Sequence, residues 1–337
     1  MNNSLKLNHF DSPKRKLIVP ILLAVVALVV VLVLYLQNPA VTEAVLASMI
    51  RQSTPLILGA LCGILCERAG IVNIGIEGQM LLSAFLAYMT NVWTGNLWLA
   101  VFVGLLTGAV LGLLLAFTSI QLKLNQIIGG TIINILAIGL TGFFYQVGMT
   151  TKGKISPIAL PGLSEIPLLG PVLFNNPPIT YIAILLVIVL QIVLFNTPWG
   201  LRTRAVGEHP RAADTVGINV FKMRYANVII GGAIAGLAGA FLTLEAVGSF
   251  ERNMTNGRGF VALAVMIFGK WNPIGAWGAA LLFGLANAIQ TQLQFMGTNI
   301  PHQFIGMIPY VLTIIVVSGF VGRSRPPAAE GEPYEKE

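Results

Sequence analysis

The sequence predicts an all-α polytopic membrane protein, and three observations lead to that fold class. The 337 residues are 55% hydrophobic and only 10% charged, and the mean hydropathy is +0.81, which excludes a water-soluble domain. Charge-free stretches are continuously apolar rather than alternating, so helices are favoured over the strands of a membrane barrel. Each supplies the roughly 20 residues that a helix needs to cross a bilayer. They cover 17–42, 78–122, 124–151, 168–201 and 271–322.

Ten membrane helices follow from the charged residues and the Gly- or Pro-containing turns that interrupt these runs. The first comes after basic residues, and its apolar run is longer than the roughly 7–15 residues of a cleavable signal peptide, which predicts a retained helix. The eighth is short and follows a glycine-rich entry, which predicts a broken helix. The predicted spans are 17–36, 43–65, 76–93, 97–118, 125–149, 179–197, 226–247, 258–270, 274–295 and 303–320.

The distribution of basic residues sets the orientation of these helices. With the N-terminus in the cytoplasm, fifteen of the 20 lysines and arginines fall on the inside. Cytoplasmic loops of membrane proteins carry such an excess, so topology explains the net charge of +7 better than nucleic-acid binding does. Both termini are therefore predicted to be cytoplasmic. The five basic residues predicted outside are Arg51, Lys152, Lys154, Arg252 and Arg258.

Polar segments divide the chain around a transmembrane domain that spans 17–322. A cytoplasmic tail, 1–16, precedes it. Residues 150–178 are rich in Pro and Gly and follow an outward-running helix, which indicates a structured external loop. Residues 198–225 form the most polar internal segment, on the cytoplasmic side. Residues 323–337 are polar and contain Pro, which predicts a disordered cytoplasmic tail.

Small residues predict close packing between helices. Gly104, Gly108 and Gly112 recur at four-residue spacing on one predicted helix, and such ridges let helix backbones approach closely in lipid. A Gly/Ala-rich helix followed by a Glu-Arg pair and a Gly-containing turn occurs at 59–78 and again at 232–259. On the predicted topology the first helix runs inward and the second outward, which is the arrangement of an inverted internal repeat.

Polar side chains within or beside the predicted helices are candidates for a translocation pathway. Ionisable groups at membrane depth are costly and usually face a cavity or a partner. For Glu77 the structural alternative is that its carboxylate accepts backbone N–H bonds at a helix start. For the others the alternative is hydrogen bonding between helices. The pathway candidates are Asn73, Glu77, Gln79, Asn134, Glu245, Asn287 and Gln290.

The cytoplasmic segment 198–225 has the signals of a short helix. Pro210 suits the first helical position, and Gly217 lies where a helix of about two turns ends. Because so short a helix is not stable alone, it must lean on this protein's own cytoplasmic ends or on a partner. The alternative is a solvated loop whose basic residues only enforce topology.

The same segment carries a family resemblance. RAADTVG, Arg211 to Gly217, resembles the cytoplasmic signature of bacterial ABC importer permeases, which has two alanines, three variable residues and a glycine. A glutamate usually precedes those alanines, and Arg211 stands there instead. The segments CERAGIVNIGIEGQMLLSAFLAY, TPWGLRTRAVGEHPRAADTVGI and GRGFVALAVMIFGKWNPIGA, in this order, resemble permeases of the nucleoside and simple-sugar branch, related to the branched-chain amino acid and ribose permeases. The resemblance covers 17–322.

The resemblance implies the ABC importer permease fold, a bacterial cell-membrane location and a pathway for nucleosides, with simple sugars as the alternative. The short helix would insert into a cleft of a separate ATPase subunit, which binds ATP and Mg²⁺, so this chain would bind no cofactor and would not be an enzyme. The other implied partners are an extracytoplasmic substrate-binding (lipo)protein and a second, related permease in a heterodimer. The residues assigned to ATPase coupling are Arg202, Arg204, Glu208, Pro210, Arg211, Ala212, Ala213, Asp214 and Gly217.

Two other classes of protein remain as alternatives. A membrane-embedded enzyme is disfavoured because the sequence contains no H-E-x-x-H or G-x-S-x-G motif, and the absence of a G-x-x-x-x-G-K-[ST] loop leaves ATP hydrolysis to another chain. Cys62 and Cys66, without a nearby His pair, make a poor metal site. An ion- or proton-coupled secondary transporter would use Glu77 and Glu245 as its carboxylates.

Overall fold

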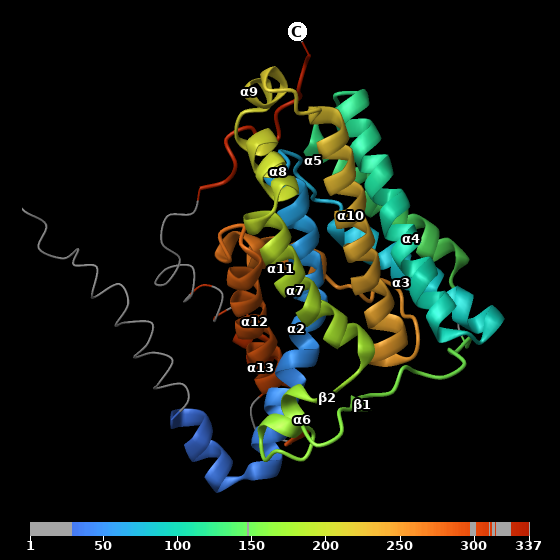
Figure 1. Ribbon diagram of the computed structural model, residues 1–337. Helices are drawn as coiled ribbons and strands as arrows, with labels where there is room; N and C mark the ends of the chain where they lie inside the picture. Colours follow the sequence, from blue (N-terminus) through green and yellow to red (C-terminus); the bar gives the residue numbers. More distant parts are fainter. Residues whose placement is uncertain are drawn as a thin grey trace, which may run out of the picture.

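The computed structural model describes residues 29–146, 148–296, 301–309, 311, 314 and 325–336, and it arranges them as a bundle of helices with little sheet (Figure 1). The predicted spans from 43–65 to 274–295 each coincide with a helix. The predicted spans 17–36 and 303–320 lie only partly within the described residues.

The elements follow the order of the sequence-based prediction. After a helical stretch over 29–37, the helices are α2 (Pro39–Arg68), α3 (Ile76–Thr94), α4 (Leu97–Ala116), α5 (Gln126–Phe144), α6 (Leu169–Leu173), α7 (Pro178–Asn196), α8 (Pro198–Glu208), α9 (Pro210–Thr215), α10 (Val220–Ala240), α11 (Arg258–Phe268), α12 (Pro273–Phe295) and α13 (His302–Gly306). Two π-helical segments, η1 (Phe117–Gln121) and η2 (Phe241–Val247), extend α4 and α10.

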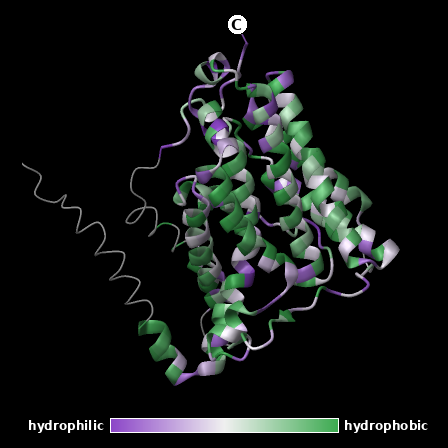
Figure 2. Cartoon of the chain, viewed as in Figure 1, coloured by the Kyte–Doolittle hydropathy of each residue, from purple (hydrophilic) through white to green (hydrophobic). Residues whose placement is uncertain are grey.

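Six helices of the described chain are long and apolar enough to cross a bilayer, which confirms the all-α polytopic class. The central ones are α2 and α10 with η2. In the most apolar stretch of each, 83% of the residues are buried, against 28% in the corresponding stretch of α5. The outer helices α4, α5 and α7 expose many large apolar side chains, as expected of a bundle that faces lipid. These helices carry mostly the hydrophobic colour in Figure 2. The six spans are Pro39–Arg68, Leu97–Gln121, Gln126–Phe144, Pro178–Asn196, Val220–Val247 and Pro273–Phe295.

The irregular segments gather at the two opposite ends of the bundle. At one end α8, α9 and the C-terminal residues lie together, and at the other lie α6 and the strand pair (Figure 1). The strands β1 (Ile158–Ala159) and β2 (Asn175–Asn176) pair antiparallel, with Ile158 opposite Asn176. The loop expected at 150–178 is therefore structured, as its Pro and Gly content predicted.

Glycines bring α4 and α10 into backbone contact. A Cβ atom added at Gly108 would lie 2.2 Å from the Gly232 carbonyl oxygen and 2.6 Å from the Gly236 Cα. A Cβ at Gly232 would lie 2.4 Å from the Gly108 carbonyl oxygen, so the approach is reciprocal. This close packing between helices is what the four-residue spacing of glycines predicted.

Replacing Gly108 with valine is expected to force α4 away from α10. The added atoms would collide with backbone rather than with a movable side chain, so the cost falls at or above the upper end of the roughly 1–3 kcal/mol typical of overpacking. The measurement is the thermal unfolding midpoint and monodisperse yield in detergent. Gly139→Val is the matched control, because nothing lies within 4 Å of a Cβ at Gly139. Equal midpoints for the two variants would contradict the prediction.

The helix α11 is too short to cross a membrane. Its 11 residues extend about 16 Å at 1.5 Å per residue, roughly half of a bilayer's hydrocarbon core. It ends beside the C-terminus of α2, where the Arg68 guanidinium donates to the Trp271 carbonyl oxygen at 3.1 Å. The broken helix predicted at 258–270 is confirmed.

Residues 325–336, which we call the C-terminal strap, pack onto the α8–α9 end of the bundle. The amide of Ala329 donates to the Gly207 carbonyl, and the amide of Gly331 donates to the Gly70 carbonyl. The composition of the tail predicted disorder, but Ala329 and Tyr334 are almost completely buried. Burial of these two side chains and the backbone hydrogen bonds offset the entropy cost of ordering the segment.

Candidate functional site

The end formed by α8 and α9 contains the short helix that the sequence predicted. Pro210 occupies the first position of α9, where a missing N–H costs nothing. The helix ends at Thr215, and Gly217 follows with φ +85°, a left-handed conformation that favours glycine. Thr197 caps the start of α8 by accepting the Gly200 amide at 3.3 Å. The helix over 210–215 is therefore confirmed.

The two neighbouring alanines of α9 differ in burial. Ala213 is buried against Val206, Val220 and Tyr334, whereas Ala212 is exposed. The inner face of α9 thus packs on its own chain, and Ala212 is exposed on its outer face. Because α9 has only six residues, the hydrophobic periodicity of its sequence does not show which of the two alanines is buried.

Charged residues surround α9 in three different situations. Arg202 and Arg211 are exposed, and Pro210 is half-buried. Glu208 accepts the Ala328 amide at 3.2 Å, and Asp214 lies 3.9 Å from the Lys336 ammonium. These groups form a polar rim.

Arg204 is not part of that rim. Its guanidinium lies over the Phe195 ring, 5.0 Å from the ring centroid, and its side chain is partly buried. It packs α8 against the end of α7.

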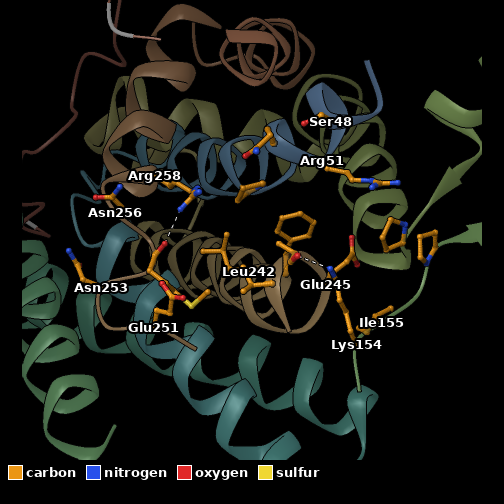
Figure 3. A pocket seen from close by; sticks show the side chains of 18 of the residues that line it. Ser48, Arg51, Lys154, Ile155, Leu242, Glu245, Glu251, Asn253, Asn256 and Arg258 are labelled. Atoms are coloured by element: carbon orange, nitrogen blue, oxygen red, sulfur yellow. Dashed lines mark hydrogen bonds between the residues drawn. The ribbon is translucent and has the colours of Figure 1, made fainter. Parts of the chain in front are cut away.

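The opposite end of the bundle contains a cavity of about 730 Å³. It lies between α2, η2, the segment 251–258 and the loop at 154–157 (Figure 3). Arg51, Lys154, Arg252 and Arg258 all line it. The sequence analysis did not single out this site, although these are four of the five basic residues that the charge distribution placed outside.

Glu245 lines the same cavity and caps α7. Its Oε2 accepts the Ile179 amide at 2.8 Å, and its Oε1 accepts the Thr180 amide at 3.2 Å and hydroxyl at 2.7 Å. Negative charge at a helix N-terminus is favourable because the unpaired N–H groups and the helix dipole point at it. Figure 3 shows Glu245 on the side of the cavity where Arg51 and Lys154 lie.

Replacing Glu245 with leucine is expected to lower the thermal midpoint by leaving the α7 donors without an acceptor, about 1–3 kcal/mol for each buried group. Glu245→Gln keeps one acceptor oxygen and is expected to fall between leucine and the wild type. Glu251→Gln is the control, because Glu251 lines the same cavity but caps no helix. A midpoint equal to that of the wild type for Glu245→Leu would rule out the capping role.

Glu77 holds the start of α11. The Gly257 amide donates to its Oε1 at 2.8 Å, and the Gly259 amide donates to its Oε2 at 2.6 Å. Gly257 has φ +80°, and a Cβ at Gly259 would lie 2.5 Å from the Glu77 Cα, so both glycines are needed for this approach. The structural alternative considered for Glu77 is therefore observed, although the helix that it caps is α11 rather than its own.

Three further pathway candidates form hydrogen bonds inside the protein. The Asn73 amide donates to Gln79 Oε1 at 3.1 Å and to the Cys62 sulfur at 3.3 Å. Asn134 accepts the Gly78 amide at 2.7 Å and donates to the Ile74 carbonyl oxygen at 3.1 Å. These contacts hold the turn between α2 and α3 and the start of α3.

The last two candidates, Asn287 and Gln290, lie on α12 and are partly exposed. Neither lines the cavity that contains Glu245. The structure therefore does not bring the seven pathway candidates together at one cavity.

Comparison with known proteins relates this chain to transport permeases. The family model described as branched-chain amino acid transport system / permease component matches residues 45–317. The guanosine ABC transporter permease protein NupQ of Bacillus subtilis is 42% identical over 84% of this chain and 94% of its own length. The nucleoside ABC transporter permease protein NupC of Lactococcus lactis is 40% identical, over 87% and 97%.

A more distant relative is the guanosine ABC transporter permease protein NupP of Bacillus subtilis, which is 26% identical over 81% of both chains. No solved structure matches the chain.

Proposed function

We propose, since this chain belongs to the branched-chain amino acid transport system / permease component family, that it forms the translocation pathway of an ATP-driven importer for nucleosides. Two relatives that share 40–42% of their residues with it, over nearly their whole lengths, are named for guanosine or nucleosides. That similarity is the observation that carries the proposal. As a permease subunit the chain is not an enzyme.

The α8–α9 end supports an assignment of ATPase coupling to this surface. α9 exposes Ala212 next to Arg211 of the polar rim. A small residue at this position allows a partner to approach closely. The proposed coupling residues are Arg202, Arg204, Glu208, Pro210, Arg211, Ala212, Ala213, Asp214 and Gly217. Arg204 and Ala213 would position this surface from within the chain, because they pack on Phe195 and on the Val206 cluster. ATP and Mg²⁺ would be bound by the ATPase subunit and not by this chain.

The proposed topology has ten membrane crossings, the eighth made by α11 together with the segment 251–257 before it, and it places the α8–α9 end and both termini in the cytoplasm. The basic residues support it, because Lys123, Arg202, Lys222 and Lys270 flank that end. An inverted repeat is supported by the meeting of α3 and α11 at Glu77, where both helices begin inside the bundle. We propose that the membrane domain spans residues 17–322.

The proposed assembly also contains an extracytoplasmic binding protein and a second, related permease. Two Bacillus subtilis proteins named as guanosine permeases, NupQ and NupP, both resemble this chain, at 42% and 26% identity. A pair of unlike permeases in one importer would account for two such relatives in one organism.

The pathway itself is proposed to start at the cavity beside Glu245 and to continue past Asn287 and Gln290. Glu77 and Glu245 are both committed to helix N-termini. That commitment supports the importer over a secondary transporter, which would need carboxylates free to bind an ion.

The experiment is affinity purification of the chain from its native membrane in mild detergent, followed by mass identification of the associated proteins. Recovery of an ATPase with a phosphate-binding loop and of a second permease is the expected result. Binding assays on the associated extracytoplasmic protein, with nucleosides and simple sugars side by side, then identify the substrate. A chain that purifies alone and transports in liposomes without ATP would overturn the proposal.

A further inference from the structure

The C-terminal strap joins the end of α8 to the turn after α2 through its backbone. Ala329 donates to the Gly207 carbonyl of α8 at 2.9 Å, and Gly331 donates to the Gly70 carbonyl, just beyond α2, at 3.2 Å. The Ala328 amide donates to the Glu208 carboxylate. The strap therefore binds the end of α8 and the end of α2 within four consecutive residues.

Two buried side chains anchor the strap. Ala329 is 4% exposed and Tyr334 is 6% exposed. Tyr334 packs in one cluster with Val206 of α8, Ala213 of α9 and Val220 of α10. The inner face of α9, which is six residues long and not stable by itself, thus rests partly on the strap.

A buried arginine connects the strap to α10. Arg224 is 1% exposed, and its Nε donates to the Ala69 carbonyl at 3.1 Å while its Nη1 donates to the Glu332 carbonyl at 3.0 Å. A buried guanidinium needs such acceptors. The strap supplies one of them, and the turn after α2 supplies the other.

A chain of contacts also leads from the strap to α11. Glu330 lies beside Glu67, and Glu67 accepts the indole N–H of Trp271, which follows α11. At the other end of the strap, Glu335 pairs with Lys123, whose ammonium lowers the pKa of the Glu335 carboxyl. The strap thus touches structural elements from both halves of the sequence.

We propose that the C-terminal strap fixes α9 to the end of α2 and to Arg224 of α10, so that a displacement of α9 by the ATPase subunit is passed to these transmembrane helices. The inference rests on the proposed coupling role of α9. The strap is a positioning element, because its Tyr334 packs on the inner side of α9 and leaves Ala212 exposed at the edge of a groove that α9 and the strap share.

The test compares two neighbouring alanines in the reconstituted importer, with its ATPase, binding protein and second permease. Ala329→Gln places a larger polar side chain in a buried position, and Ala328→Gln places the same side chain at an exposed one. A spin label on Pro333→Cys reports whether the strap is bound, since both native cysteines are buried. Transport per ATP hydrolysed is the functional readout, because simple loss of folded protein leaves this ratio unchanged.

The expected result for Ala329→Gln is a mobile label, normal ATPase association and a several-fold loss of transport per ATP hydrolysed. Ala328→Gln is expected to behave as the wild type. For a chain truncated after Ser324, a free peptide of residues 325–336 is expected to restore the ratio. A released strap with an unchanged ratio, or a truncated chain that couples normally, would overturn the inference. If the proposed function itself were wrong, the unsubstituted chain would already fail to associate with the ATPase, so the two failures are distinguishable.

Discussion

Replacing Ala212 with glutamate is expected to abolish association of the ATPase subunit while leaving the permease folded and inserted. Ala212 lies on the exposed face of α9, at the edge of a groove between α9 and the strap, so a larger charged side chain there obstructs the partner without entering the buried cluster around Ala213. A bulky charge at the centre of a docking surface lowers affinity more than loss of a charge at its rim. The measurement is co-purification of the ATPase, together with the thermal midpoint of the permease.

Ala213→Glu provides the contrast to this variant. Its side chain would be buried among Val206, Val220 and Tyr334, so both the thermal midpoint and ATPase association are expected to fall. Ala212→Ser, which adds one small group, is expected to keep both. Normal recovery of the ATPase with Ala212→Glu would remove α9 from the proposed docking surface.

Replacing Glu77 with alanine is expected to cause the largest loss of stability among the polar substitutions. The amides of Gly257 and Gly259 would lose their acceptor inside the bundle, at about 1–3 kcal/mol for each orphaned donor. The α11 N-terminus would also lose its compensating negative charge. The thermal midpoint in detergent and protection of the 257–262 amides from hydrogen exchange measure the effect.

Two further variants make this result specific. Glu77→Gln retains one acceptor oxygen and is expected to lose less stability than Glu77→Ala. Glu165→Ala removes a carboxylate that is exposed in the loop at 150–178, and it is expected to leave the midpoint unchanged. Wild-type hydrogen exchange at 257–262 in Glu77→Ala would show that α11 does not depend on Glu77.

The polar stretch between α2 and α3 illustrates how a membrane protein uses buried polar groups. Asn73, Glu77 and Gln79 form hydrogen bonds across the turn or to another helix. Glu67 and Arg68 bind the segment after α11 through Trp271. The stretch lies where helices begin or end at membrane depth. The first N–H groups of a helix have no partner within it, so in lipid each needs an acceptor from elsewhere in the protein.

The sequence alone determined the features that depend on local composition. Charge-free runs marked the helices because a bilayer admits only segments that satisfy their own backbone groups. Pro210 and Gly217 bounded α9 because their backbone preferences act at single positions. The short apolar run after Gly257 marked α11 in the same way.

Only the tertiary structure decided which distant groups meet. Glu77 and Gly257 are 180 residues apart, and Glu245 and Ile179 are 66 apart, so no local pattern encodes either cap. The same holds for the four basic residues around the cavity beside Glu245, for the burial of Ala213 rather than Ala212, and for the strap, whose polar composition is typical of disorder. Each depends on long-range packing, because a polar or small residue acquires its role from the partner that the fold places beside it.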